Sequence, residues 1–328
     1  MNLPPDFLSN IQNVFEEDGT AFLKALPDLI AEASARWGLT DVEPVSNLSF
    51  NFVAFANRPS TALPIGRSAQ DERVVLKIGV RNDELISEMA AMRLFDGDGA
   101  CRLIDSDEER GFLLLERLTP GVMLSTLKDD EQATHIAAEV MQKIWRDLEP
   151  GSLLPNTRQQ AVGLQNKFIR LSDWFDGLKK LRAKFNGGTG PFDKNLVERV
   201  EQSVRDFFIE NHKPVLMHGD FHHFNILSSE RGWLVIDAKG VIGPAGYEVG
   251  PFLINPWGDM LNGIRQKRMT ERRFDILHEH LGFERERIRE WGLAHAVLSA
   301  WWDIEDNTGR GEYALDFAAM LADIPLHS

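Results

Sequence analysis

The chain contains the stretch His218-Gly219-Asp220-Phe221-His222-His223-Phe224-Asn225, and an apolar run, Leu234-Val235-Ile236, leads to Asp237 twelve residues after Asn225. Carboxylate and amide oxygens are the ligands that Mg²⁺ prefers, and a correctly placed carboxylate can also accept a proton. Gly219 and the strand-like runs on either side favour a loop. The two stretches therefore predict a metal-dependent site on loops between short strands.

The spacing H-x-D-x-x-x-x-N is that of the catalytic loop in kinase-like phosphotransferases. In such a loop Asp220 is expected to accept the proton of the acceptor hydroxyl, and Asn225 and Asp237 are expected to bind Mg²⁺. Each residue taken alone is equally compatible with a turn or cap. The three together favour transfer of the γ-phosphoryl group of a nucleotide to a hydroxyl.

Composition sets the broad class. The 328 residues are 43% hydrophobic and 26% charged, enough for a large core and for two lobes. One cysteine, Cys101, excludes an intrachain disulfide framework and suits a reducing compartment. Neither a signal peptide nor a run of about 18 uncharged apolar residues occurs, so we expect a cytoplasmic protein without a membrane partner.

The net charge of −14 argues against a nucleic-acid partner, which would need clustered Lys and Arg. It would attract a cationic small molecule, although many proteins are acidic for solubility alone. The oligomeric state stays open.

The hydrophobic pattern changes near residue 116, which predicts an α+β chain with two lobes. Residues 1–116 are expected to form a small strand-rich N-terminal lobe, and residues 117–328 a larger helical C-terminal lobe, with the active site between them. Strands are expected at 48–55, 74–78, 112–115, about 215–218 and within 225–237; helices at 12–38 (kinked at Pro27), 84–95, 130–148, 168–185, 194–210 and over most of the chain beyond 257. Residues 57–67 read as a loop or hairpin tip, and Gly187–Gly190 as a linker between helices.

Lys77 is the one charged residue of the apolar strand Val74–Ile78, and a buried ammonium needs a partner. We expect it to contact the α- and β-phosphates of the nucleotide and to pair with Glu88, with Glu84 as the competing partner. An exposed lysine on an edge strand is the alternative.

Other residues are expected around the nucleotide. No glycine-rich phosphate loop occurs, and Ser49 and Asn51, in the stretch 46–51, are the best substitutes. The backbone from Glu116 to Leu118 is expected to meet the adenine edge. His222 and Lys239 are expected near the phosphates, with a solvated loop position as the alternative for Lys239.

The segment Trp301-Trp302-Asp303-Ile304-Glu305-Asp306 combines indoles with three carboxylates. Asp303, Glu305 and Asp306 are therefore candidates for binding a polycationic substrate, with help from cation–π contacts. Core tryptophans followed by charges at a helix end are the alternative.

The histidines of the loop invite a zinc hypothesis, which the loop context and the lack of accompanying ligands oppose. We expect His218 to brace the loop through hydrogen bonds, and Glu248 to anchor the loop rather than to touch substrate.

Several segments together resemble the aminoglycoside phosphotransferase family, and within it the branch of streptomycin 6-kinases and hydroxyurea phosphotransferases. The segments are His218–Asn225, Ile236–Lys239, Val75–Gly79, Phe95–Ala100, Leu114–Gly121 and Gly243–Glu248. The resemblance runs from about residue 45 to 255. It implies a two-lobed, protein-kinase-like fold, ATP and Mg²⁺ as cofactors, and phosphorylation of a small-molecule hydroxyl. It also implies Asp220 as base, Asn225 and Asp237 as metal ligands and Lys77 as phosphate ligand.

Two departures from the family's pattern concern Glu248, where an aspartate is expected, and the region beyond 255, which has no decisive match. The leading hypothesis is an antibiotic-resistance kinase acting on a streptomycin-like aminoglycoside or aminocyclitol. The alternative is a catalytically silent, kinase-like nucleotide-binding protein. Protein-kinase activity is disfavoured, because only ten residues separate Asp237 from Glu248.

Overall fold

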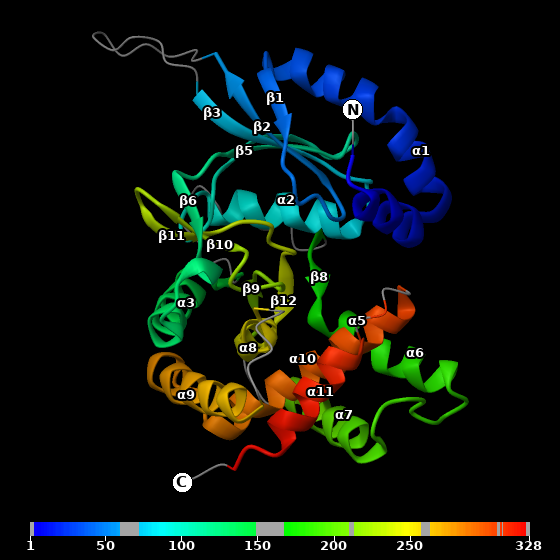
Figure 1. Cartoon of the computed structure of the whole chain (residues 1–328), viewed down its shortest axis with the longest axis vertical. Coiled ribbons are helices and arrows are strands. Elements are labelled where there is room, and N and C mark those ends of the chain that lie inside the picture. Colours follow the sequence, from blue (N-terminus) through cyan, green and yellow to red (C-terminus); the bar gives the residue numbers. More distant parts are fainter. Residues whose placement is uncertain are drawn as a thin grey trace.

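Alternating apolar residues build a five-stranded antiparallel sheet in the first third of the chain (Figure 1). The computed structural model describes residues 3–59, 72–148, 167–209, 213–256, 263–306, 309 and 311–325. The sheet has the order β1-β2-β3-β5-β4. Its elements, with the two helices of this region, are α1 (Pro5–Trp37), β1 (Thr40–Pro44), β2 (Phe52–Arg58), β3 (Glu72–Ile78), α2 (Asp83–Phe95), β4 (Leu103–Asp107) and β5 (Phe112–Glu116).

The two faces of this sheet bury different cores. Phe112 and Leu114 of β5 belong to one apolar cluster together with α1, whereas Leu113 and Leu115 belong to a larger cluster together with α2. Successive side chains of a strand point to opposite faces, so one strand can supply both cores. The sheet is therefore a wall between α1 and α2.

Helix α1 bends at a position that the sequence did not indicate. Pro27 lies inside the helix, and the residue with non-helical angles is Glu16, at φ 48° and ψ −118°. The residues around Pro27 keep helical angles, so this proline does not divide the helix. The helix also begins at Pro5 and not at residue 12.

Helix α2 lies between the sheet and the rest of the molecule. It starts where the Asn82 side chain accepts a hydrogen bond from Leu85 N (2.8 Å) and ends at Asp96 in the left-handed region. Ser87 Oγ donates to Gly240 O (2.6 Å). A Cβ on Gly240, at φ +68°, would lie 2.6 Å from Ser87 O, so a glycine is required where this loop passes the helix.

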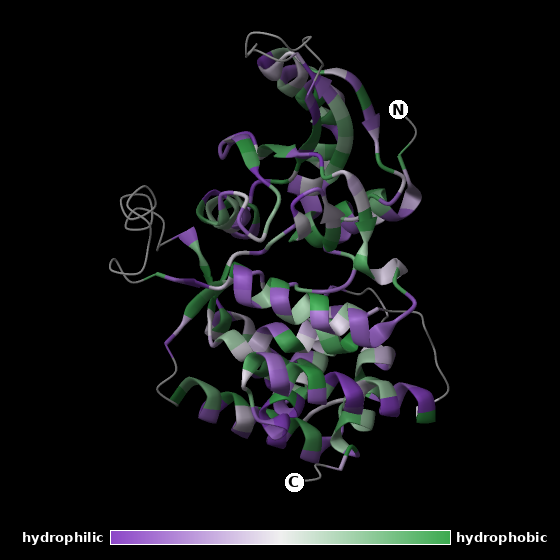
Figure 2. Ribbon diagram, turned by 90° about the vertical axis from the view of Figure 1, so that its left-hand side faces the viewer, coloured by the Kyte–Doolittle hydropathy of each residue, from purple (hydrophilic) through white to green (hydrophobic). Residues whose placement is uncertain are grey.

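The rest of the chain forms a larger, mainly helical lobe with two small sheets, of order β11-β10-β6 and β7-β9-β12-β8 (Figure 1). Its helices mix hydrophobic and hydrophilic segments (Figure 2). Its strands are β6 (Pro120–Met123), β7 (Arg146–Asp147), β8 (Ile169–Arg170), β9 (Val215–Met217), β10 (Ile226–Ser229), β11 (Gly232–Val235) and β12 (Val241–Gly243). Its helices are η1 (Leu124–Thr126), α3 (Asp130–Ile144), α5 (Leu171–Phe175), α6 (Gly177–Lys184), α7 (Lys194–Ile209), η3 (Ala245–Glu248), α8 (Val249–Ile254), α9 (Gly263–Leu281), α10 (Arg285–Glu305) and α11 (Gly311–Ala322).

The protein-kinase-like, two-lobed fold was thus correctly predicted, with local corrections. The single helix expected at 168–185 is β8 followed by α5 and α6, because residues 169–170 pair with β12 before the helices begin. Gly187–Gly190 does link two helices. Beyond residue 59, the predicted hairpin tip lies outside the described residues. The lobe boundary at residue 116 remains a prediction.

None of the helices in the described ranges is long and apolar enough to cross a membrane.

A buried arginine ties three helices of the larger lobe together. Arg273 of α9 is 1% exposed, and its guanidinium donates to both carboxylate oxygens of Asp130, the first residue of α3. Its Nη1 also donates to Leu253 O (3.2 Å) and Asn255 O (2.7 Å) at the end of α8. A cation at that helix end is favourable, because the last carbonyls of a helix carry partial negative charge.

Replacing Arg273 by methionine is expected to lower the free energy of unfolding by about 3 kcal/mol, because it leaves Asp130 without its partner. Adding Asp130→Leu should restore part of the loss, since removing both charges costs less than removing one. Urea denaturation followed by circular dichroism measures both variants. A single variant as stable as the wild type would contradict this account.

Candidate active site

A buried ammonium connects β3, α2 and the loop after β11. Lys77 points to the α2 face of the sheet, opposite to Leu76 and Ile78, which pack under α1. Its Nζ donates to Glu88 Oε1 (2.7 Å) and Oε2 (2.6 Å) and also to Asp237 Oδ1. Burial alone would lower the pKa of Lys77, but the carboxylates of Asp237 and Glu88 outweigh it and raise the pKa. Lys77 is therefore a cation at neutral pH.

The competing partner, Glu84, has a different role. Its Oε2 lies 3.5 Å from Lys239 Nζ. Burial disfavours the charged form of Lys239, yet the carboxylates of Glu84, Asp237 and Asp220 raise its pKa above the usual lysine range. The structure thus places two lysines in one acidic cleft, each with its own glutamate from α2.

The loop that contains Asp220 is held by buried hydrogen bonds. Glu248 accepts from His218 N (3.1 Å) and Gly219 N (2.8 Å), which confirms its predicted anchoring role. His218 Nε2 contacts Ile236 O (2.8 Å), and Asp220 N donates to His218 Nδ1 (3.1 Å), so the imidazole braces the loop as expected.

The bonds of His218 require a neutral ring with its hydrogen on Nε2. This agrees with the pKa of His218, which burial lowers to about 4. Gly219 is needed beside it at φ +88°, because a Cβ there would lie 2.4 Å from Val241 Cγ2.

Asp220 presents its carboxylate beside cationic groups. Burial would raise its pKa, but His222 and Lys239 lower the pKa below the usual carboxyl range. His222 Nε2 lies 3.6 Å from Asp220 Oδ1. Burial lowers the pKa of His222, but the charge of Asp220 has the larger effect and raises it. The carboxylate is therefore ionised and able to accept a hydrogen bond or a proton.

His222 contacts other residues of its own loop. Its Nε2 lies 3.3 Å from Asn225 Nδ2 and 3.6 Å from Asp220 Oδ1, so it supports these side chains from within the loop. It is not among the residues that line the two cavities beside the loop. Its expected approach to the phosphates stays a prediction.

Asn225 and Asp237 face the same cavity as Lys77. Asn225 Nδ2 donates to Asp220 O (3.1 Å), which turns the amide oxygen to the other side. The pKa of Asp237 is lowered, since Lys77 and Lys239 outweigh the effect of burial. An amide oxygen and an ionised carboxylate fit Mg²⁺, which takes few protein ligands and hard oxygen donors. In the described ranges no group of three or more His, Cys, Asp or Glu side chains is arranged to hold a metal, so the loop histidines do not form a cluster.

Two cavities meet at this cleft and share Asn51 and Glu88. The first, of about 440 Å³, lies between the sheet and the β10–β11 hairpin. It contains Lys77, Asn225 and Asp237 together with predicted residues from the β1–β2 loop and the connector, namely Ser49, Asn51, Glu116 and Leu118.

The wall of this first cavity also includes residues that the sequence did not single out. Phe55 of β2 and Phe224 of the loop are 36% and 37% exposed, and the guanidinium of Arg117 stacks on the Phe55 ring at 3.8 Å. The backbone from Glu116 to Leu118 was predicted to contact the adenine edge. The N–H of Glu116 already donates to Arg102 O (2.9 Å), so it is not available as a donor to the base.

The second cavity, of about 650 Å³, contains Asp220 and Lys239. Six carboxylates and one ammonium line it, together with Trp174 and Trp302, whose rings meet edge to face at 5.4 Å. The six are Asp83, Glu84, Glu88, Asp220, Glu305 and Asp306. Glu84, Glu88 and Glu305 are each paired with a lysine, which leaves the negative charges of Asp83, Asp220 and Asp306 beside the aromatic rings. Such a wall favours a cationic ligand.

The acidic end of α10 supplies two of its three predicted residues. Glu305 and Asp306 line the second cavity together with Trp302, three and four residues before them, which lies on the same helix face. Asp303 is not among the residues that line it. Burial raises the pKa of Asp306, and the repulsion of Glu305, Asp303 and Glu84 adds to this effect.

Comparison with known proteins agrees with this geometry. The family described as aminoglycoside/hydroxyurea antibiotic resistance kinase matches residues 51–307. The chain is 28% identical to streptomycin 6-kinase of Streptomyces glaucescens (98% of this chain, 95% of that one). It is 30% identical to hydroxyurea phosphotransferase of Kitasatospora aureofaciens (90% and 77%).

A solved structure with the same fold is that of an aminoglycoside phosphotransferase in complex with ADP and hygromycin B. The two chains are 16% identical and superpose with a TM-score of 0.55, over 91% of this chain and 99% of the other.

The Glu248 carboxyl gives stability a defined pH dependence. Burial raises the pKa of Glu248 to about 8, against the opposing effect of the N–H groups of Gly219 and His218. A carboxyl whose pKa is higher in the folded than in the unfolded chain contributes stability at low pH and loses it as the pH rises. Relative to a Glu248→Gln variant, the free energy of unfolding of the wild type should fall between pH 4.5 and about 8 and level off above. Denaturation curves of both proteins across this range test it, and parallel pH profiles would count against it.

Proposed function

The chain belongs to the aminoglycoside/hydroxyurea antibiotic resistance kinase family, which makes it a small-molecule kinase, and we propose that it transfers the γ-phosphoryl group of ATP, with Mg²⁺, to a hydroxyl of a cationic small molecule. The observation that carries this proposal is the pair of adjoining cavities. Lys77, Asn225 and Asp237 line one of them, and Asp220 lines the other. Such an arrangement allows a nucleotide and an acceptor to meet at one point.

The first cavity is proposed to hold the nucleotide. The Lys77 ammonium neutralises phosphate charge, and Glu88 keeps it in place at 2.6 Å. Mg²⁺ bound by Asn225 and Asp237 would neutralise the charge that develops on the phosphate oxygens. Ser49 and Asn51 offer polar contacts from the β1–β2 loop in place of glycine amides. In the related phosphotransferase structure the bound nucleotide is ADP, which supports a nucleotide site of this kind.

Asp220 is proposed to orient the acceptor. Its carboxylate accepts the proton of the acceptor hydroxyl while the oxygen forms its bond to the γ-phosphorus and the bond from this phosphorus to the β,γ-bridging oxygen breaks. ADP then leaves with the bridging oxygen. In a loose transition state positioning matters more than basicity, so a low pKa of Asp220 is compatible with this role.

The charge of the second cavity supports a cationic acceptor. Glu305 and Asp306 lie on the α10 side of this cavity, and Glu84 lies on the α2 side. The relatives named streptomycin 6-kinase and hydroxyurea phosphotransferase indicate which acceptors to screen, from a large guanidino sugar to a small neutral molecule. The acidic lining favours the cationic sugar over the neutral molecule. We also propose that residues 1–116 and 117–328 act as the two lobes that enclose the nucleotide.

Replacing Asp220 by asparagine should lower kcat with streptomycin by a factor of about 1,000 or more, because the acceptor proton loses its base. ATP binding, measured by titration calorimetry, should persist, since Asp220 lies in the second cavity. Turnover close to that of the wild type would overturn the assigned role. Wild-type enzyme that binds ATP and phosphorylates none of a panel of hydroxylated amines would instead favour the silent nucleotide-binding alternative.

Removing two charges from the second cavity tests the cationic acceptor. The variant Glu305→Gln/Asp306→Asn should raise KM for streptomycin about tenfold and weaken its dependence on salt, with a smaller effect on KM for ATP. The matched control is Glu312→Gln/Asp316→Asn, which removes the same charge from exposed positions of α11. Equal effects of the two double variants would show that only the net charge matters.

A further inference from the structure

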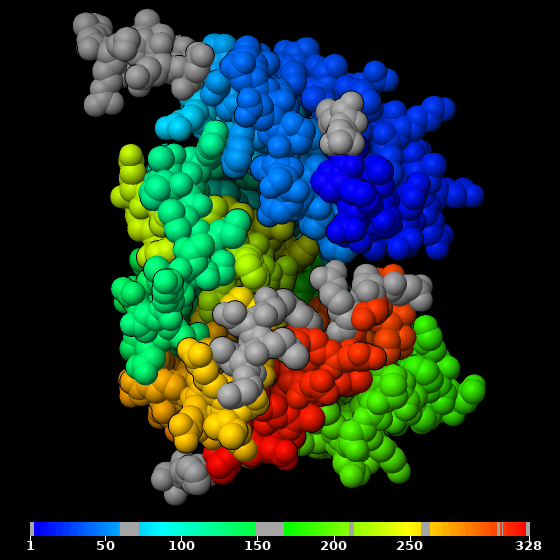
Figure 3. Space-filling view, in the orientation of Figure 1, coloured from blue at the N-terminus to red at the C-terminus, as the bar shows by residue number. Residues whose placement is uncertain are grey.

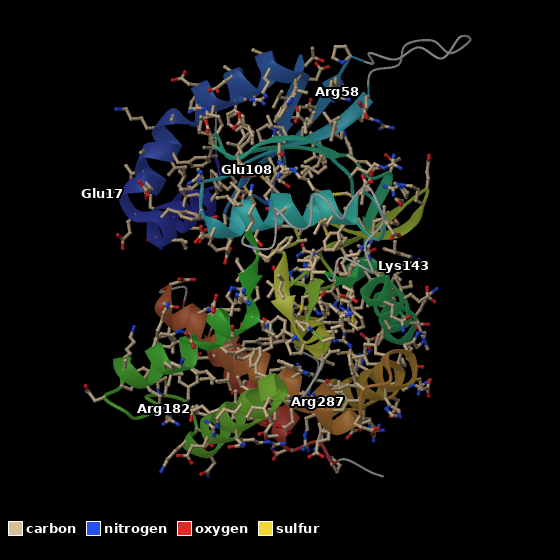
Figure 4. The ribbon with its side chains drawn as sticks, turned by 180° about the vertical axis from the view of Figure 1, so that it is seen from behind. Glu17, Arg58, Glu108, Lys143, Arg182 and Arg287 are labelled. Atoms are coloured by element: carbon tan, nitrogen blue, oxygen red, sulfur yellow. The ribbon has the colours of Figure 1, made fainter. Side chains whose placement is uncertain are left out.

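The bend in α1 is strained and has no local explanation. Glu16 adopts φ 48° and ψ −118°, a combination that only glycine accepts easily, and its side chain is exposed. Glu17, the next residue, lies beside the bend on the outside of the lobe (Figure 4). A strained residue persists only where the surrounding structure holds it in place.

The segment before the bend, Pro5–Phe15, is here called the N-terminal arm. Its Phe7 and Ile11 are fully buried and belong to the same core as Leu48 and Phe52. A Cβ on Gly19 would lie 2.3 Å from Ile11 O, so this glycine lets the two parts of α1 approach closely. The arm is therefore packed in one position, and the strain at Glu16 is the consequence.

The bend brings the end of the arm to the second cavity, where Val14 and Phe15 form part of its wall. Figures 1 and 3 show the first turns of α1, in dark blue, on the opposite side of the inter-lobe hollow from the end of α10. Trp302, Glu305 and Asp306 come from that opposite side. Asn10 Nδ2 also donates a long hydrogen bond (3.5 Å) to Ser49 O, in the loop that borders the nucleotide cavity.

We propose that Phe15 is a specificity-determining residue of the acceptor site, and that the bend at Glu16 is the positioning device that holds it there. This inference rests on the proposed function, since it assigns a wall of the same acceptor cavity. Phe15 adds an apolar side chain to a cavity wall that also contains carboxylates, a combination suited to an organic cation with hydrophobic surface. Acceptor choice thus depends on both ends of the chain, residues 14–15 and residues 302–306.

Phe15→Ala should raise KM for streptomycin about tenfold, without a matching rise in KM for ATP, because an apolar contact to the acceptor is lost. The matched control is Leu8→Ala, which shortens a half-buried apolar side chain of the same arm outside the cavity. If both variants change the two KM values alike, the effect of Phe15 is structural and the inference fails.

A second measurement needs no acceptor. In the variant Phe15→Cys the new thiol is the accessible one, because Cys101 is buried. In this background, Glu16→Gly allows the positive φ of the bend without strain. Glu16→Pro instead fixes φ at about −65°, so the arm has to leave its position. Alkylation of the new thiol should be several times faster with proline than with glycine, with circular dichroism as the check on folding.

The two measurements separate the inference from the proposed function. Equal alkylation rates in folded glycine and proline variants would overturn the inference whatever the acceptor is. The expected difference in alkylation, together with no phosphorylation of streptomycin or any other cationic acceptor, supports the placement of the arm and counts against the proposed acceptor class. Should the proline variant not fold, Gly19→Ala moves the arm by a backbone clash and replaces it in the same assay.

Discussion

The active-site cleft depends on one buried ammonium. Lys77 is 4% exposed, and a charge at such a position is tolerated only with close partners of opposite charge. Its partners come from two other parts of the chain, Glu88 on α2 and Asp237 after β11. The sheet, the helix and the hairpin must therefore meet at this point, and the nucleotide cavity lies in the space that they enclose.

A second set of buried hydrogen bonds makes the catalytic loop rigid. Glu248 receives two backbone N–H groups, and His218 connects Ile236 to Asp220. The second cavity is less evenly balanced. Three of its six lining carboxylates, Glu84, Glu88 and Glu305, are paired with lysines, and Asp83, Asp220 and Asp306 add negative charge to the same wall. Burial and the neighbouring carboxylates raise the pKa of Asp306, whereas Lys77 and Lys239 lower that of Asp237.

Much of the site could be predicted because its residues belong to short local patterns. The sequence shows Lys77 inside an apolar strand and Glu88 in the helix that follows, so their pairing could be predicted. Glu84 lies one turn before Glu88 on the same helix. The errors have equally physical causes. The non-helical residue of α1 is Glu16, which no local pattern marks, because packing of the arm against the sheet overrides local propensity. Asp303 was grouped with its acidic neighbours by sequence distance, but the helix face that lines the cavity contains Trp302, Glu305 and Asp306.

The sequence by itself determined the fold class and the residues that could perform phosphoryl transfer, because strand and helix periodicity and motif spacing are local properties of the chain. Only the tertiary structure decided which residues line the second cavity. Phe15, Trp174 and Asp306 are far apart along the chain, and no local pattern relates them. They meet because buried apolar surface fixes how α1, α5 and α10 lie around the cleft, and that arrangement is a property of the whole core.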